Sequence, residues 1–249
     1  MKRIERKHLK ENDLAYTIES ARDYLAPRTK ALTTVALIVV VFVLGIAGIS
    51  LWRNRSAAAG DRALAEAMVA LNAQVVPAGV EGAEGVPAAA SLGATGTFST
   101  EEAKLNAAVP KLKAAADAHP STNAGIQARY HLAGALAALG KHQEAITAFD
   151  EVVAQSGANS LYGTMARLGK ADAQARAGQL DAAIESWKGM TTANDENIPV
   201  DAVLIQLARA YVQKANPEEA RKAFSEIVDK HPDSPYSPEA REELENLKG

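Results

Sequence analysis

The chain has 249 residues, of which 47% are hydrophobic and only 5% aromatic, and it contains no cysteine. This alanine-rich composition favours helices packed on helices, and the lack of cysteine excludes disulfides, thiol nucleophiles and thiolate metal sites. The net charge is +5 over residues 1–55 (ten Lys or Arg, five Asp or Glu) and −8 over residues 56–249 (17 against 25), so nucleic-acid binding by the acidic part is not expected.

Residues 1–30 form a basic tail that contains eight Lys or Arg. Apolar residues recur in it at helical spacing, after the helix-capping pair Asn12-Asp13 and before Pro27: Leu14, Ile18, Ala21 and Leu25. The pattern predicts a short amphipathic helix. Either it touches lipid or a partner, or it is a solvated leader.

Residues 31–52 form a run of 22 without a charged side chain. At about 1.5 Å per residue, a helix of this length spans a hydrocarbon core of about 30 Å. Lys30 and Arg53 close the run, and Trp52 sits where an interfacial aromatic is expected. The run therefore predicts a transmembrane helix. A cleaved signal peptide is the alternative, but the apolar run is too long and Arg53 and Arg55 interrupt the approach to a cleavage site.

The charges next to this span do not decide its orientation, because three basic residues flank it on each side within twenty residues. The whole basic tail favours an N-terminus in the cytoplasm, since short tails count most in the positive-inside rule. We therefore expect the larger part of the chain on the opposite side of the membrane. A reporter fused at Gly249 distinguishes this from a cytosolic location.

Residues 53–76 are predicted to form an amphipathic helix that leads into the rest of the chain, on the spacing of Leu64, Met68, Leu71 and Val75. Residues 77–99 then lose all helical periodicity and are rich in Gly, Pro and Ala. They are predicted to be a flexible insertion, long for a loop within a compact domain.

A repeat of 37 or 38 residues dominates the remainder of the chain. Each unit has an alanine followed four positions later by a large apolar residue: Ala108 and Leu112, Ala145 and Phe149, Ala183 and Trp187, Ala220 and Phe224. A small residue lets two helices approach closely, and the large residue fills the groove between neighbouring pairs. Three of these helices follow a partner that ends in a turn with a residue suited to a left-handed cap, at Gly140, Gly178 and the sequence Ala215-Asn216-Pro217. Paired helices of this kind stack into a solenoid.

The pattern at residues 136–149, with Leu139-Gly140 and Glu144-Ala145-Ile146, resembles the tetratricopeptide repeat, and so does the pattern at residues 208–235. The resemblance implies tetratricopeptide-like repeats over residues 100–236, followed by a C-terminal capping helix at 237–249. The expected fold is all-α, with an N-terminal transmembrane helix and a helical-repeat solenoid.

The complete layout is similar to the YfgM-type single-pass bacterial inner-membrane proteins. That resemblance implies a periplasmic repeat domain, tethered in the inner membrane, that acts as an adaptor or chaperone-like partner of the Sec translocon. The expected partners are translocon subunits, a periplasmic chaperone or exported polypeptide segments, with self-association left open. The alternative is a scaffold subunit of a cell-envelope assembly for secretion, division or motility.

No pattern in the sequence indicates chemistry. The five histidines form no pair at helical metal-ligand spacing, and neither a nucleophile motif nor a phosphate-binding loop is present. We therefore expect no catalytic, cofactor-binding or metal-binding residue, and no enzymatic activity.

The expected binding surface is the concave face, which in this repeat family is lined by the first helix of each pair. Ten residues are predicted to lie there: Gln127, Tyr130, Met165, Leu168, Asp172, Arg176, Ile205, Arg209, Val212 and Gln213. Their mixture of apolar and charged groups suits an extended or helical peptide. Tyr130, Leu168 and Ile205 are equally suited to filling the seam between helix pairs.

Overall fold

The computed structural model describes residues 29–76, 97–192 and 198–247. The short amphipathic helix predicted within the basic tail, and residues 77–96 of the predicted insertion, lie outside this part of the chain. The chain divides into two compact units, residues 1–55 and 56–249.

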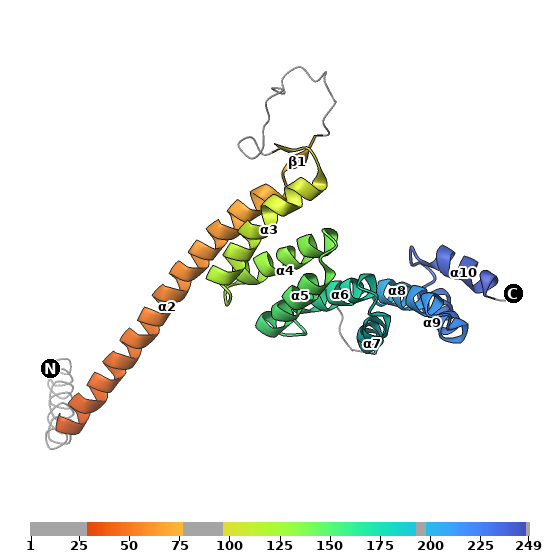
Figure 1. The fold of residues 1–249 in the computed structure, drawn as a ribbon. Coiled ribbons are helices and arrows are strands. Elements are labelled where there is room, and N and C mark those ends of the chain that lie inside the picture. Colours follow the sequence, from red (N-terminus) through yellow and green to blue (C-terminus); the bar gives the residue numbers. More distant parts are fainter. Residues whose placement is uncertain (1–28, 77–96, 193–197, 248–249) are drawn as a thin grey trace, which may run out of the picture. The chain divides into compact units, whose positions relative to one another are not determined.

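Helices make up almost all of the described residues, which confirms the predicted all-α class (Figure 1). The elements in chain order are α2 (Thr29–Leu71), β1 (Gln74–Val75), β2 (Thr97–Phe98), α3 (Glu101–Ala118), α4 (Asn123–Ala138), α5 (His142–Ser156), α6 (Leu161–Arg176), α7 (Leu180–Thr191), α8 (Val200–Gln213), α9 (Pro217–Lys230) and α10 (Ser237–Asn246).

In the first unit, α2 presents an uninterrupted apolar surface. Large side chains such as Phe42, Leu44 and Trp52 are 66–68% exposed. Of the described helices, α2 alone is long and apolar enough to cross a membrane. Among the described residues, no buried core packs against these apolar side chains.

The structure corrects the predicted end of the helix that leads into the repeats. The helix ends at Leu71, and Gln74–Val75 instead pairs as a short parallel strand with Thr97–Phe98. The Val76 amide extends this pairing by donating to the carbonyl of Phe98 over 2.8 Å. Two-residue strands have almost no periodicity of their own, so the hydrophobic pattern alone could not reveal the pairing.

In the second unit, the C-terminal part of α2 packs against α3. Ala67 and Ala70 share a core with Leu105 and Ala108, whereas the earlier Ala63 packs with residues near the end of α3. The order runs in opposite directions along the two helices, so they are antiparallel. This is the first helix pair of the repeat array.

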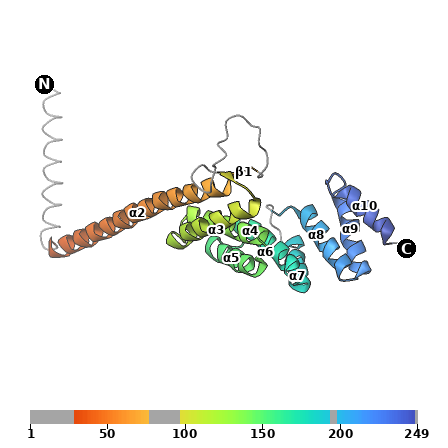
Figure 2. The same ribbon diagram turned by 45° about the horizontal axis from the view of Figure 1, so that its top comes forward.

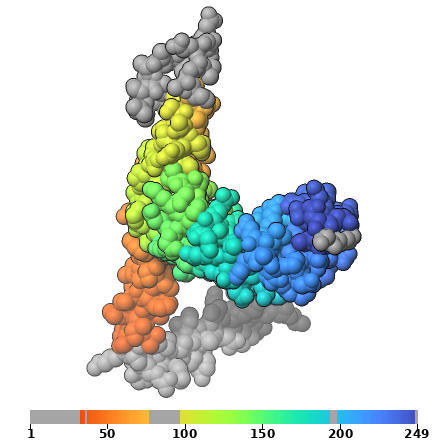
Figure 3. Space-filling model, turned by 45° about the vertical axis from the view of Figure 1, so that its right-hand side comes forward, coloured from red at the N-terminus to blue at the C-terminus, as the bar shows by residue number. Residues whose placement is uncertain are grey.

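The following helices pair in sequence order, as α4 with α5, α6 with α7 and α8 with α9, and each pair also contacts the next. Figure 2 shows α8, α9 and α10 side by side, and in Figure 3 the successive helices form adjoining bands from green to blue. Contacts between near neighbours in sequence are the mark of a helical-repeat array.

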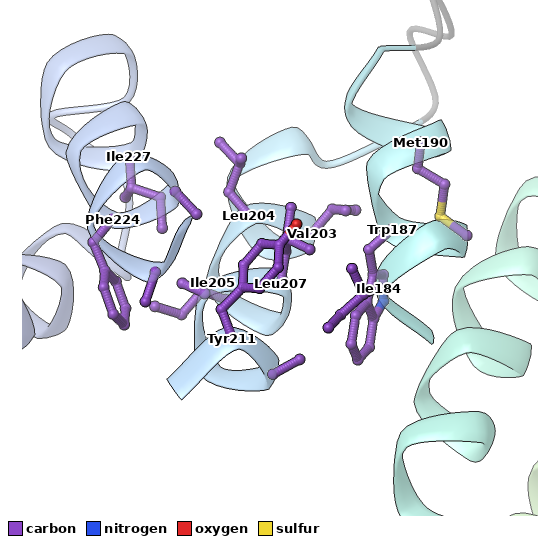
Figure 4. Packing of buried hydrophobic residues seen from close by; sticks show 14 of the residues in the cluster. Ile184, Trp187, Met190, Val203, Leu204, Ile205, Leu207, Tyr211, Phe224 and Ile227 are labelled. Atoms are coloured by element: carbon purple, nitrogen blue, oxygen red, sulfur yellow. The ribbon is translucent and has the colours of Figure 1, made fainter. Parts of the chain in front are cut away.

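The alanine and large-residue landmarks form the core of these pairs. All four landmark alanines are completely buried, and the four large residues are at most 4% exposed: Ala108, Ala145, Ala183, Ala220, Leu112, Phe149, Trp187 and Phe224. Figure 4 shows this core at α8, whose Leu204 and Tyr211 lie between Trp187 of α7 and Phe224 of α9. The repeating landmarks therefore have the packing role that the sequence predicted.

Two of the three predicted left-handed caps are confirmed. Gly140 and Gly178 have φ of 74° and 78°, a region where a side chain costs energy and glycine does not. At the third turn the left-handed residue is Ala215, with φ of 52°, and Asn216 instead accepts from the Glu219 amide over 3.3 Å to cap α9. Ala215 lies two residues after the end of α8, the same position that Gly140 and Gly178 occupy after α4 and α6, so the left-handed conformation falls there and Asn216 is free to cap α9.

Candidate partner-binding surface

The first helices of the second and third pairs, α4 and α6, begin with the same local structure. Thr122 and Ser160 cap these helices, and their hydroxyl oxygens accept from the amides of Gly125 (3.1 Å) and Gly163 (3.0 Å). Each hydroxyl also donates to the carbonyl at the end of the previous helix, at 2.9 and 2.8 Å. A Cβ at either glycine would lie within 1.9 Å of a backbone oxygen, so these positions tolerate no side chain. This capping motif fixes the residue at which α4 and α6 each begin.

A buried arginine fixes α4 to the helices on both sides. Arg129 is 8% exposed, and its guanidinium donates to Asp117 of α3 over 2.8 Å and to Glu151 of α5. A nearly buried charge requires such partners, because leaving it unpaired would be expensive. Arg129 therefore holds the backbone next to Tyr130 in place.

Tyr130 lies at the centre of an aromatic cluster. Its ring centroid is 6.0 Å from that of Phe149 in α5 and 5.7 Å from that of Tyr162 in α6, both in edge-on geometry. Burial, with a smaller effect of Tyr162, raises the pKa of Tyr130 above its usual 10.0. Burial likewise lowers the pKa of the adjacent His131 below 6.5. The half-buried ring of Tyr130 thus joins α4 to α6 while part of its area stays accessible. Tyr130 therefore both fills the seam between the helix pairs and contributes to the accessible surface.

One face of α6 continues from this cluster as a line of partly or fully exposed residues. Met165 and Leu168 are half-buried, and Asp172 and Arg176 are exposed. The spacings of three and four residues place them on the same side of the helix, in line with Tyr162. We call the six side chains from Tyr130 to Arg176 the α4–α6 stripe: Tyr130, Tyr162, Met165, Leu168, Asp172 and Arg176.

Asp172 is accessible to solvent but lies among many protein atoms. Desolvation raises the pKa of its carboxyl above 3.8, and the charge of Arg176, one turn away, opposes the rise. The Asp172 carboxyl is therefore harder to ionise than a fully hydrated one, although solvent reaches it. The apolar end of the α4–α6 stripe is followed by two residues of opposite charge, Asp172 and Arg176.

The α8 residues of the predicted surface separate into two groups. Ile205 is completely buried in the core around α8, so it fills the seam and lies outside any accessible groove. Val212, at 42% exposure, and Gln213 are exposed near the end of α8. Gln127, in the first turns of α4, is half-buried.

Arg209 is exposed but already paired within the chain. Its guanidinium donates from Nε and Nη2 to the two carboxylate oxygens of Glu239 in α10, over 2.8 and 2.6 Å. This bidentate bond and the charge of Glu239 raise the pKa of Arg209 further. A partner that uses Arg209 would have to compete with Glu239, so the side chain is a weaker candidate than those of the stripe.

Tyr162 belongs to the surface although the sequence pattern did not single it out. It lies before Met165, the first α6 residue in the predicted set, and its contact with Tyr130 shows its position. The repeated spacing Thr122-x-x-Gly125 and Ser160-x-x-Gly163, 38 residues apart, is the signal that could have placed the start of α6 and hence Tyr162.

A hollow of about 450 Å³ lies between α7, α8 and α9. Its wall includes the ion pair between Asp181 and Lys214, together with Glu185, Lys188 and Glu219. These charges of both signs largely offset one another. Within the described ranges no group of three His, Cys, Asp or Glu residues is arranged to hold a metal ion.

Comparisons with known proteins agree with this architecture. Residues 102–160 and 202–234 each match a sequence model described as tetratricopeptide repeat. A putative kinesin light chain with nearly identical tetratricopeptide-like repeats from Podosopora anserina is 20% identical, with a TM-score of 0.50, over 58% of this chain and 77% of that one. A tetratricopeptide repeat protein from Parabacteroides merdae is 19% identical, with a TM-score of 0.49, over 60% of this chain.

The chain spans 56% of the Parabacteroides protein that it matches. No curated protein matches the sequence significantly. The matched segments cover α3 with the pair α4 and α5, and the pair α8 and α9. Residues 102–160 and 202–234 therefore contain tetratricopeptide repeats, a repeat type that implies protein–protein interaction, and the fold is confirmed to be a helical-repeat array.

Proposed function

We propose that this protein is a membrane-tethered protein–protein interaction module in which α2 crosses the bilayer and the repeat domain holds a partner protein on the α4–α6 stripe. Two observations support the two halves of the proposal. The matched tetratricopeptide repeats imply a protein–protein interaction module, and the apolar run of α2 is exposed along its whole described length. The protein carries out no chemistry of its own in this proposal.

The α4–α6 stripe is the observation that supports the partner-binding part of the proposal. Partly exposed aromatic, thioether and aliphatic groups offer dispersion contacts, and Met165 adapts to partners of different shape. Asp172 and Arg176 then provide one acceptor and one donor group at the other end of α6. Such a surface suits an extended or helical segment with several apolar residues and a polar end.

The location follows from charge and from the resemblance in layout. We place the N-terminus in the cytoplasm, the span in the bacterial inner membrane and the repeat domain in the periplasm. The partners in this arrangement are subunits of the Sec translocon, a periplasmic chaperone or segments of exported polypeptides. The basic tail and the similarity to YfgM-type proteins support it.

Purification of the full chain from mildly solubilised membranes tests the proposal. We expect translocon subunits or a periplasmic chaperone to co-purify, and a Met165→Glu variant to lose them because it places a charge in the apolar part of the stripe without touching Leu168, which packs against the core. A Thr147→Glu variant, altered at an exposed position of α5, serves as the matched control and should retain them.

Other outcomes distinguish the alternatives. Recovery of a single stoichiometric subunit of a secretion, division or motility assembly would favour a structural scaffold. Recovery of the same proteins with both variants would remove the α4–α6 stripe from the proposal. If a reporter at Gly249 shows activity only in the cytoplasm, the periplasmic location is wrong.

A further inference from the structure

Two arginines follow the apolar run of α2 and lie outside the α4–α6 stripe. Arg53 comes directly after Trp52 and Arg55 two residues later, and all three side chains are exposed. Between Thr29 and Gly60 the sequence contains no Asp or Glu. The two arginines therefore place two positive charges at the edge of the apolar run, and the nearest acidic residue in the helix, Asp61, lies six positions beyond Arg55.

From these positions we propose that Trp52, Arg53 and Arg55 form a binding site for the headgroups of anionic phospholipids. The inference rests on the proposed membrane span of α2. An arginine guanidinium can donate two parallel bonds to a phosphate, which a lysine ammonium cannot do. An indole next to it suits the boundary between hydrocarbon and headgroups.

Helix geometry places both arginines at the depth of lipid phosphate. The headgroup region is about 5–7 Å thick on each side of the hydrocarbon core. With Trp52 at the hydrocarbon edge, Arg53 and Arg55 lie about 1.5 and 4.5 Å further along the helix axis. Arg62 follows about 15 Å beyond Trp52 in the same helix, well past this layer.

The angular positions also fit lipid better than a single acidic partner. Trp52 and Arg55 are three residues apart and share one side of α2, whereas Arg53 points about 100° away from Trp52. The two guanidinium groups thus flank the indole and face different neighbours around the helix. A bilayer surrounds a helix on every side and supplies a phosphate to each.

The test uses Trp52 itself as the reporter. The chain has two tryptophans, and the other, Trp187, is 3% exposed in the core of the repeat domain. The full-length protein is reconstituted into phosphatidylcholine vesicles that contain phosphatidylglycerol. Either one lipid or the other carries brominated acyl chains that quench tryptophan fluorescence on contact. A Trp52→Phe variant gives the Trp187 signal, which is subtracted.

We expect phosphatidylglycerol to occupy the lipid positions around Trp52 up to about thirty times more readily than phosphatidylcholine, as two surface arginines should provide. The double variant Arg53→Gln/Arg55→Gln should bring the ratio to about one. Arg62→Gln, an exposed arginine of the same helix, should leave it unchanged. High salt should reduce the preference of the native protein.

Two results would overturn the inference while leaving the membrane tether intact. One is equal quenching by the two lipids in the native protein, as expected if the arginines bind an acidic protein segment instead. The other is an undiminished preference in the double variant. If neither lipid quenches Trp52, α2 is not in the bilayer, and both this site and the proposed tether are wrong.

Discussion

At the scale of single residues, glycine has opposite effects at two positions of the same helix pair. Gly140 has φ of 74° in the turn after α4, whereas Gly134 lies exposed in the middle of α4, where a Cβ would have nothing within 4 Å. Gly140→Ala should lower the free energy of unfolding by about 1 kcal/mol, because alanine is strained at positive φ.

Gly134→Ala is the matched comparison, and it should raise the free energy of unfolding by about 0.5–1 kcal/mol through better helix propensity. Urea denaturation of the two variants measures both effects. A loss at Gly134 as large as that at Gly140 would show that the difference does not come from backbone conformation.

Asp172 gives a prediction about pH. Because desolvation raises the pKa of its carboxyl in the folded state, the folded protein binds a proton more tightly there than the unfolded chain does. Ionised Asp172 therefore costs stability above its folded pKa, and this cost disappears below the unfolded value of about 3.8. Asp172→Asn should raise the stability at pH 7, and the gain should shrink as the pH falls towards 4.

Denaturation midpoints across this pH range measure the effect. Asp150→Asn is a suitable comparison, since Asp150 forms a salt bridge with Lys170 over 2.6 Å and its loss should not stabilise the protein. A gain for Asp172→Asn that is independent of pH would contradict the assignment to ionisation.

At the scale of elements, the entry turns of α4 and α6 are the part of the fold that recurs most closely. Thr122→Ala and Ser160→Ala each remove a side chain that caps a helix and also bonds to the preceding turn. Each change should cost about 1 kcal/mol of stability. Chemical denaturation measures it.

Thr147→Ala tests whether the loss belongs to capping. The Thr147 hydroxyl bonds only to the Gln143 carbonyl within the exposed face of α5, and alanine is the better helix former there. This variant should be neutral or slightly more stable. A similar loss in all three variants would mean that any hydroxyl in these helices contributes equally.

Elements with strong local signals could be predicted from the sequence, and those that depend on distant contacts could not. The landmark alanines predict the helix pairs, because close packing of two helices requires a small residue. Gly140 predicts a turn, because positive φ favours glycine. The pairing of Gln74–Val75 with Thr97–Phe98 joins segments separated by a long insertion. The left-handed Ala215 also escaped prediction, because alanine is not a residue type that favours positive φ, although Pro217 disfavours a helical backbone at the preceding Asn216.

The candidate surface shows the same division. The repeat phase placed Met165, Leu168, Asp172 and Arg176 on one accessible face of α6. Phase alone did not show that Ile205 is completely buried, since burial there depends on how α8 packs with its neighbours. The pairing of Arg209 with Glu239 was equally hidden, because it joins α8 to the terminal helix.

At the scale of the whole repeat domain, the core divides into a part centred on α2 to α6 and a part centred on α6 to α10. Trp187 belongs to the second and Phe149 to the first. Either change to alanine should cost about 3–5 kcal/mol. Because repeat arrays are stabilised by neighbouring contacts, each loss should be felt mainly in its own part.

Hydrogen exchange of the two variants measures this directly. Trp187→Ala should lose amide protection in α7 to α9 and retain more of it in α3 to α5, and Phe149→Ala should show the reverse. Equal loss of protection along the whole domain in both variants would indicate a single cooperative core instead of a repeat array.

The central claim is that the exposed face of α6 holds a partner protein for a membrane-tethered chain. Site-specific photocrosslinking in living cells tests it most directly, with the photoreactive residue placed at Met165 in one strain and at Thr147, on α5, in the other. We expect a discrete crosslinked protein at Met165 that is absent at Thr147. The same crosslinked species at both positions, or at Thr147 alone, would contradict it.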